Sequence, residues 1–389
     1  MPSLSLRLRS ASVLVLVCGL LAPGLARAAD TIVVGLRPGA LAATALDAAD
    51  AVQVGAVPRL RVVVVHVAPA RRAAALRALR RSRAVRYAEP LRRLQALADP
   101  VPGPVPDPGR PQQWALDAIG ADAAWAVTRG AGVVVAVIDT GVAPAPDLAG
   151  RLLPGWNAIA RTADATDDNG HGTHVAGTIA EVAGNGLAEA GVAPEASILP
   201  VKVLDSTGAG SDADVAAGIV WAADHGARIV NLSLGGSDAS SVLADAVSYA
   251  RAKGLLIVAA AGNDGGAVGV PARLGGVVAV GAVDSSRARA PFSAGGRALD
   301  LVAPGVGILQ QTLDGAGGYA DRSLSGTSMA SPQVAGVAAL VLAAGRVRTA
   351  AGVARLLART ALDLGLPGRD GAYGAGLVRA DAALGVPIP

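Results

Sequence analysis

The sequence contains little cysteine and few aromatic residues. One cysteine, Cys18, occurs in 389 residues, and aromatic side chains make up 2% of the chain. A lone cysteine excludes an intramolecular disulfide and a cysteine–zinc site. The shortage of aromatics leaves Val, Leu, Ile and Ala to fill the core, which favours an α/β fold with closely packed helices and sheet. It also argues against a nucleic-acid partner, because base stacking needs aromatic side chains.

Long apolar runs that could cross a membrane are also lacking. The longest uncharged stretch, 323–345, is interrupted by Pro332 and Gln333 and predicts a buried helix of a soluble domain. Residues 1–28 combine a basic start, an apolar run at 11–22 and the small-x-small sequence Ala26-Arg27-Ala28. This pattern is typical of a cleaved signal peptide and predicts a secreted protein, extracellular or periplasmic, with no membrane contact after cleavage. A short N-terminal anchor is the alternative.

Charge is divided unevenly along the chain. Residues 1–98 hold 15 arginines against 4 acidic residues, whereas the remainder holds 19 of the 34 basic and 26 of the 30 acidic residues, a net charge of −7. The positive charge therefore lies in a part that we expect to be removed, which further weakens a nucleic-acid function.

Three segments follow the signal. Residues 29–98 predict a small α+β domain of ferredoxin-like β-α-β-β-α-β order, with strands at 31–36, 61–67 and 85–90 and a helix at 73–82. Residues 99–111 contain six prolines and predict an extended, exposed linker that is open to proteolysis. Residues 112–389 form the third and largest segment.

The third segment alternates apolar strands with helices. Strands are predicted at 133–139, 197–204, 228–234, 255–262 and 277–283, and helices at 212–225 and 239–253. Continuously apolar strands indicate a parallel sheet with helices on both faces. In such sheets the functional residues gather at the carboxyl ends of the strands.

Three polar residues in this segment are candidates for catalysis. Asp139 ends a predicted strand, His171 opens a helix between glycines, and Ser328 enters the long apolar helix. Taken singly, they could be a turn aspartate, a metal ligand paired with His174, and a helix N-cap. Together they supply a nucleophile, a base and a carboxylate that orients the base, in the chain order Asp, His, Ser.

A fourth residue fits the same chemistry. Asn263 follows the predicted strand 255–262, and its amide can donate a hydrogen bond to a developing oxyanion beside the backbone N–H of Ser328. An ordinary turn asparagine is the alternative. A nucleotide-binding Rossmann protein is a further one, but no strand is followed by G-x-G-x-x-G, and a catalytically dead binding homologue would not need the full set.

Five motifs carry a resemblance to a known family. They are Asp139-Thr140-Gly141, His171-Gly172-Thr173-His174-Val175-Ala176-Gly177, Asn231-Leu232-Ser233-Leu234-Gly235-Gly236, Ala261-Gly262-Asn263 and Gly326-Thr327-Ser328-Met329-Ala330. In this order and spacing, 112–384 resembles the subtilisin-like serine peptidases. Residues 30–98 resemble the family's inhibitory propeptide, most clearly at Tyr87-Ala88-Glu89-Pro90.

The resemblance implies a secreted, monomeric endopeptidase that acts on proteins and peptides, processes its own precursor and has its propeptide as an intramolecular inhibitor. It implies a cleft between two edge strands and a primary pocket without acidic walls that prefers large apolar residues before the scissile bond. The implied substrate-binding residues are Ser233, Leu234, Gly235, Gly236, Gly208, Ala209, Gly210, Ala260, Gly262 and Gly269.

The resemblance further implies a structural calcium ion that takes no part in the chemistry. Hard oxygen ligands suit calcium. The matching positions are Asp107, Asp147, Val182, Asn185, Leu187 and Glu189.

Overall fold

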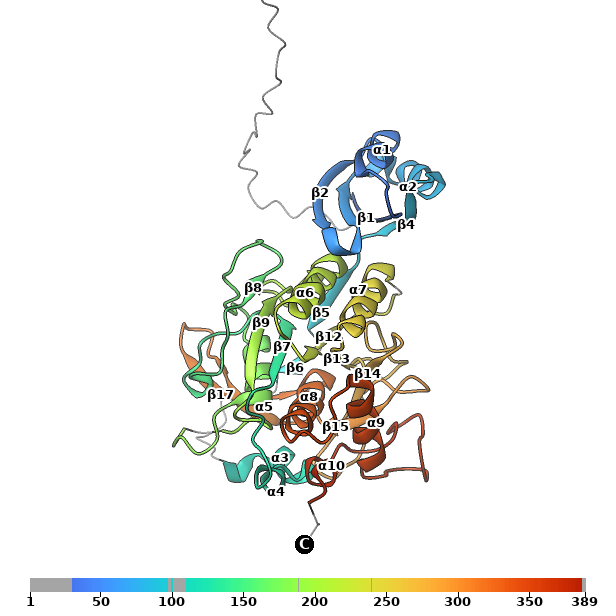
Figure 1. Ribbon diagram of the computed structural model, residues 1–389. Coiled ribbons are helices and arrows are strands. Elements are labelled where there is room, and N and C mark those ends of the chain that lie inside the picture. Colours follow the sequence, from blue (N-terminus) through green and yellow to red (C-terminus); the bar gives the residue numbers. More distant parts are fainter. Residues whose placement is uncertain (1–29, 97–98, 101–109, 188, 239, 387–389) are drawn as a thin grey trace, which may run out of the picture.

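The computed structural model describes residues 30–96, 99–100, 110–187, 189–238 and 240–386 (Figure 1). The expected signal peptide and most of the proline-rich linker, Asp107 included, lie outside the described residues. Within the described part of the chain, no helix combines the length and the apolar character needed to cross a membrane.

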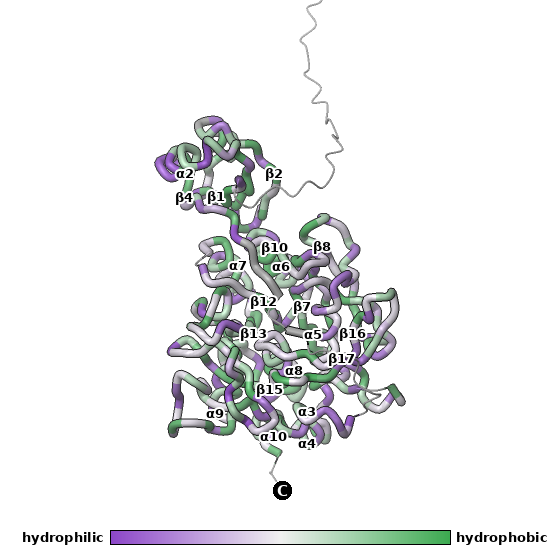
Figure 2. Tube along the Cα trace, turned by 180° about the vertical axis from the view of Figure 1, so that it is seen from behind, coloured by the Kyte–Doolittle hydropathy of each residue, from purple (hydrophilic) through white to green (hydrophobic). Residues whose placement is uncertain are grey.

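An N-terminal domain is built on one small antiparallel sheet. Its strand order is β2-β3-β1-β4, and Leu79 of α2 packs on one face of the sheet in a core with Ile32, Val34 and Val65. Arg77, Arg80 and Arg81 of α2 are exposed, and Figure 2 colours much of this helix as hydrophilic. The order confirms the ferredoxin-like prediction. The elements are β1 (Thr31–Leu36), α1 (Ala42–Leu46), β2 (Val52–Val57), β3 (Val62–His66), α2 (Arg72–Arg81) and β4 (Val85–Pro90).

The C-terminal domain contains a seven-stranded sheet of order β15-β14-β13-β11-β7-β9-β8, in which every pairing of neighbouring strands is parallel. This confirms the predicted fold class. The strands are β7 (Val134–Asp139), β8 (Trp156–Asn157), β9 (Ser197–Lys202), β11 (Ile229–Leu232), β13 (Leu256–Ala260), β14 (Val277–Val283) and β15 (Leu301–Pro304).

Helices cover both faces of this sheet. One core joins α5 and α8 to the sheet, and the other joins α6 and α7 to its opposite face. The uncharged stretch around Pro332 forms the central, buried helix α8. The helices are α3 (Trp114–Ile119), α4 (Ala121–Trp125), α5 (His171–Ala180), α6 (Asp212–Asp224), α7 (Ser241–Ala252), α8 (Thr327–Ala343), α9 (Ala350–Thr360) and α10 (Ala380–Leu384).

Two small antiparallel sheets join the domains. One has the order β10-β5-β12 and the other β16-β17-β6. The segment after β4 therefore does not leave the molecule: it pairs twice with the C-terminal domain, and the first two linker residues form β6. The strands are β5 (Arg93–Ala96), β6 (Asp99–Pro100), β10 (Ala209–Ser211), β12 (Leu234–Gly235), β16 (Ile308–Leu313) and β17 (Tyr319–Ser325).

The N-terminal domain packs on α6 and α7 (Figure 1). Arg86 Nη2 lies 2.5 Å from Asp245 Oδ2 on α7, and Tyr87 donates to the same oxygen at 2.9 Å. Glu89 Oε1 accepts the backbone N–H of Ser241, the first residue of α7, at 2.8 Å. A carboxylate placed there satisfies a free N–H and complements the helix dipole.

Candidate active site

The carboxyl end of β7 and the start of α5 bring Asp139 and His171 together. Asp139 Oδ1 lies 2.7 Å from His171 Nδ1 and also accepts the backbone N–H of Thr140 at 2.8 Å. Both side chains are buried. The contact places the Nδ1 proton of the imidazole toward the carboxylate, which leaves Nε2 as the basic nitrogen.

Gly172 allows α5 to approach β7 this closely. A Cβ atom at this position would lie well under 3.0 Å from the carbonyl oxygen of Gly141, nearer than real Cβ atoms come to any neighbour. The Gly172 N–H donates to Thr140 Oγ1 at 2.9 Å. This glycine therefore fixes the distance from the helix to the turn after Asp139.

Two opposing effects act on the pKa of His171. Burial lowers this pKa, but the charge of Asp139 and the hydrogen bond to it together act more strongly, so the net pKa is raised above its ordinary value. A histidine with a raised pKa accepts a proton from a neighbouring hydroxyl more readily.

Ser328 lies fully buried in the first turn of α8, where backbone N–H groups have no acceptor within the helix. Pro332 has no N–H, so the carbonyl of Ser328 lacks its usual helical donor. Ser233 Oγ donates to that carbonyl instead, at 2.7 Å. The proline thus allows the segment after β11 to fix the backbone of Ser328.

The hydroxyl of Ser328 donates to the carbonyl oxygen of Ser233 at 3.0 Å. His171 Nε2 is buried without a hydrogen-bond partner in the described part of the chain. The serine–histidine hydrogen bond is therefore not formed in this arrangement. A change of the Ser328 χ1 rotamer redirects Oγ without moving the backbone.

Asn263 lies beside the start of α8. Its Oδ1 accepts from both the backbone N–H and the Oγ1 of Thr327, at 2.9 Å each. Because the oxygen is fixed in this way, the NH₂ end of the amide is the donor that the side chain can offer to a substrate. The amide is thus anchored to the residue that directly precedes Ser328.

His174 has a structural role. Its Nε2 lies 3.0 Å from the carbonyl of Ile308 and 3.1 Å from that of Arg322, so it carries the proton. Burial lowers the pKa of His174 to about 4, which keeps the ring neutral. The two histidines are therefore not arranged as a metal site.

The two expected cleft edges both pair with β5. Ala209 pairs with Gln95 and Gly210 with Leu94 on one side, while Gly235 pairs with Gln95 on the other. Gly208 directly precedes β10, and Ser233 directly precedes β12. An extended segment of the chain thus already lies between the edges as the middle strand.

A pocket of about 470 Å³ adjoins this cleft. Its lining includes the five expected residues Gly235, Gly236, Ala260, Gly262 and Gly269. It also includes Asp264 and Arg273, which the sequence did not indicate. The five expected wall residues carry no acidic side chain, but Asp264 adds a carboxylate to the lining. The expectation of a pocket without acidic walls is therefore wrong.

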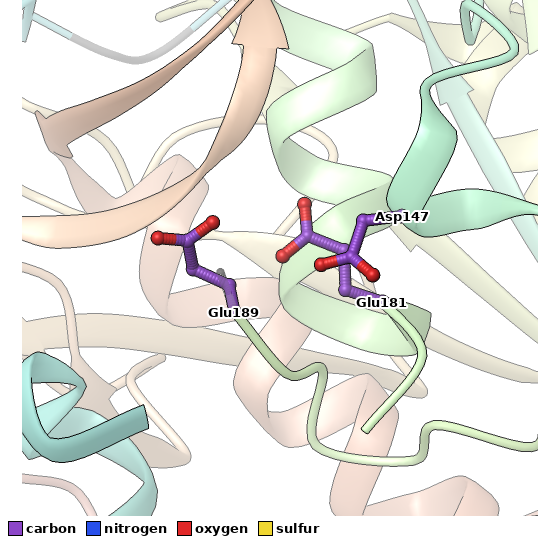
Figure 3. Close-up of side chains that lie close together, drawn as sticks. All are labelled: Asp147, Glu181 and Glu189. Carbon is purple, nitrogen blue, oxygen red and sulfur yellow. The ribbon is translucent and has the colours of Figure 1, made fainter. Parts of the chain in front are cut away.

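The expected calcium positions are brought together only in part (Figure 3). Carboxylate oxygens of Asp147, Glu181 and Glu189 all lie within 4.8 Å of one another, and all three residues are buried. Glu181 was not expected from the sequence. Burial, and then the charges of Glu189 and Asp147, raise the pKa of Glu181 well above its ordinary value.

Asn185 differs from its expected role as an oxygen ligand. Its Nδ2 donates to Asp147 Oδ1 at 2.5 Å, and its Oδ1 accepts the backbone N–H of Leu187. Val182 donates its N–H to the carbonyl of Asp147 at 2.9 Å. Asp107 lies outside the described residues.

On the far side of Ser328 the chain pairs a second time. Asp99 pairs with Ser325 and Pro100 with Leu324, the last two residues of β17. Ser325 precedes Ser328 by three residues, so β5 and β6 flank the serine from both sides.

Two family matches cover most of the chain. Residues 130–376 match the subtilase family, and residues 26–90 match the fervidolysin N-terminal prodomain.

Known proteases and solved structures are also similar to this chain. The chain is 47% identical over 255 residues to alkaline elastase YaB of Bacillus sp. (strain YaB), covering 65% of each. It is 46% identical over 255 residues to subtilisin Savinase of Lederbergia lenta, covering 65% of this chain and 91% of that protein. Fervidolysin from Fervidobacterium pennivorans superimposes with a TM-score of 0.81 at 32% identity, covering 92% of this chain and 61% of that one. The match thus spans just under two thirds of the length of the elastase.

Proposed function

Because the chain belongs to the subtilase family of serine endopeptidases, we propose that it is a secreted, monomeric, broad-specificity endopeptidase made as a self-processing precursor. The domains are a signal peptide (1–28), an inhibitory prodomain (29–98), a linker (99–111) and a peptidase domain (112–389). The observation that carries the proposal is the strand β5 between β10 and β12, because it lies in the cleft as an extended substrate would.

The chemistry follows from the four groups described above. Ser328 Oγ attacks the peptide carbonyl carbon and gives its proton to His171 Nε2. Asp139 stabilises the imidazolium through Nδ1. The Asn263 amide and the Ser328 N–H donate to the oxyanion, and the imidazolium then protonates the leaving amine. Water hydrolyses the acyl-enzyme by the same steps.

Substrate preference follows from the cleft and its pocket. Edge strands bind an extended peptide through main-chain hydrogen bonds, which any sequence can make. The glycine and alanine walls leave room for a large apolar side chain before the scissile bond. Asp264 and Arg273 add opposite charges at the pocket, so charged side chains are a second class of substrate to test there.

The pairing on both sides of Ser328 supports self-processing at a defined place. β5 ends at Ala96 and β6 begins at Asp99. The bond that is cut therefore lies between these two residues. Cleavage leaves residues up to this point in the cleft as a bound product, and the prodomain then acts as an inhibitor.

Ser328→Ala tests this function. We expect the variant to lose about 10⁶-fold in turnover and to remain an uncut precursor. N-terminal sequencing of the active protein should begin at residue 97, 98 or 99. The matched control is Ser248→Ala, which removes a hydroxyl that bonds only within α7. A processed Ser328→Ala protein from a protease-free host would contradict self-cleavage.

Calcium fits the carboxylate cluster of Asp147, Glu181 and Glu189. Asp147 Oδ2 is buried without a hydrogen-bond partner among the described residues, and three carboxylates at this separation need a cation or protons. A bound calcium ion supplies charge neutralisation and joins the 182–189 loop to the turn at Asp147. The ion has no part in catalysis.

A further inference from the structure

A second cavity lies at the opposite edge of the sheet from the active site. Its volume is about 550 Å³, and it is lined by the first residues of three neighbouring strands, Leu256, Val277 and Leu301. Ala350 and Ala354 of helix α9 line one side of the cavity. The catalytic residues lie beyond the carboxyl ends of the strands, so the two sites are on opposite edges.

Four arginines line this cavity, against one acidic residue, Asp300. Arg369 Nη2 lies 2.8 Å from Asp300 Oδ1, so the charges of these two residues neutralise each other. Arg273 and Arg355 make no ion pair within the described part of the chain. The lining therefore carries an excess of positive charge.

The fourth arginine, Arg251, is held in place beside two glycines. Its Nη1 donates to the carbonyl of Gly275 at 3.0 Å. A Cβ atom at Gly276 would lie well under 3.0 Å from Arg251 Nε, so the missing side chain makes room for the guanidinium. This charge is positioned before any ligand arrives, which lowers the entropy cost of binding an anion.

The rest of the lining is largely apolar. It is made of short aliphatic side chains, among them Leu255, Leu274, Val278, Ala351 and Ala358. Guanidinium groups beside an aliphatic wall suit a carboxylate that carries an apolar chain. The guanidinium donates two parallel hydrogen bonds to the carboxylate, and the aliphatic wall buries the apolar chain.

We propose that this cavity binds the C-terminal carboxylate of a peptide that ends in apolar residues. Hydrolysis of a peptide bond after an apolar residue creates such an end, so the ligand is the amino-side product of the reaction. This assignment rests on the proposed function. Arg273 lines both this cavity and the primary pocket.

The test uses the full-length Ser328→Ala chain, in which β5 occupies the cleft between β10 and β12. The probe is acetyl-Leu-Leu-Leu with a free carboxylate, and titration calorimetry measures its Kd. We expect saturable one-to-one binding, and at least about tenfold weaker binding of the C-terminal amide. Arg355→Ala should weaken binding of the acid by a similar factor. Arg359→Ala, one turn further along α9 and outside the lining, should not.

Equal binding of acid and amide, or binding unchanged by Arg355→Ala, would overturn the proposal. Decanoate that binds more tightly than the peptide acid would overturn the assignment to peptides. Because this experiment needs no catalysis, its failure leaves the peptidase function standing, and loss of that function leaves the measured Kd unaffected.

Discussion

The two faces of α7 show two ways of holding this molecule together. The inner face packs Val242, Leu243 and Ala246 into the core beneath the sheet, where all three are fully buried. The outer face and first turn meet the prodomain through the charges of Asp245 and Glu89, and the prodomain adds buried apolar residues, Val57 and Leu60 among them, to the same core cluster. Apolar burial is largely insensitive to salt and pH, whereas partly exposed ion pairs depend on both. The contact with the prodomain thus combines apolar burial with ion pairs, and only the ion-pair part should depend on salt and pH.

Gly172→Ala should destabilise the peptidase domain itself, and we expect it to have the largest effect of the substitutions considered. The added methyl group meets the Gly141 carbonyl, and neither α5 nor β7 can yield without moving other buried residues. We expect a loss of about 3 kcal/mol in the free energy of unfolding, measured by denaturant titration in the Ser328→Ala background. Gly275→Ala is the control, because its Cβ would meet nothing within 4 Å. Equal midpoints for the two variants would refute the steric argument.

Calcium removal should also weaken the peptidase domain. A cation bound only by the folded state at a hundred times its Kd contributes about 2.7 kcal/mol, and excess chelator removes this contribution. The thermal midpoint of Ser328→Ala should therefore fall by several degrees. Asp147→Asn should make the midpoint insensitive to chelator. A midpoint that chelator leaves unchanged in the parent would show that the cluster holds protons instead.

Asp245→Ala should weaken the prodomain contact and leave the peptidase domain intact. The substitution removes the partner of both Arg86 and Tyr87, worth about 1–2 kcal/mol at this partly exposed site. We expect residues 30–98, added in trans, to inhibit the mature variant about tenfold less well. Inhibition of the parent should set in more slowly as salt rises, because the prodomain segment is net positive and the remainder net negative. Asp284→Ala serves as the control, because the hydrogen bonds of this half-buried aspartate lie within its own turn.

The smallest expected effect is a pH dependence of the same contact. Burial raises the pKa of Asp212 to about 6 in the docked chain; hydrogen bonds from Ser240 and the Arg92 backbone oppose this, and the charge of Glu89 adds to it. Release of the prodomain exposes Asp212 to water, and its pKa falls back toward about 4. Above pH 6 the carboxylate is ionised in both states and the docked state is penalised. Below about pH 4 it is protonated in both states and the penalty is absent.

Affinity for the prodomain should therefore fall as pH rises from about 4 to 6, and stay level above. We expect a change of about fivefold, because Ser240 and the body of α6 still cover part of the carboxyl group after release. Binding to immobilised Ser328→Ala peptidase domain measures this without catalysis. Asp212→Asn should flatten the profile. Affinity that rises with pH would reverse the assigned cause.

The sequence predicted the features that local pattern determines. Strand runs such as 133–139 and the glycine-flanked His171 define positions at the carboxyl edge of a parallel sheet, so the meeting of Asp139 and His171 could be foreseen. Contacts that involve residues outside these motifs could not. Glu181 joins Asp147 only because α5 ends beside that turn, and Arg273 reaches the primary pocket through a turn with no motif. The pairing of β6 was missed because proline-rich composition indicates an exposed linker.

The second pairing, of β6 with β17, has a consequence for how activity appears in time. Under the proposed self-processing, β5 and β6 hold the two ends of the segment to be cut beside the serine of the same chain. The first cut is then a reaction of one molecule, and its half-time is the same in a dilute and in a concentrated preparation. Each precursor then has the same chance of its first cut per unit time, whatever the concentration of the preparation.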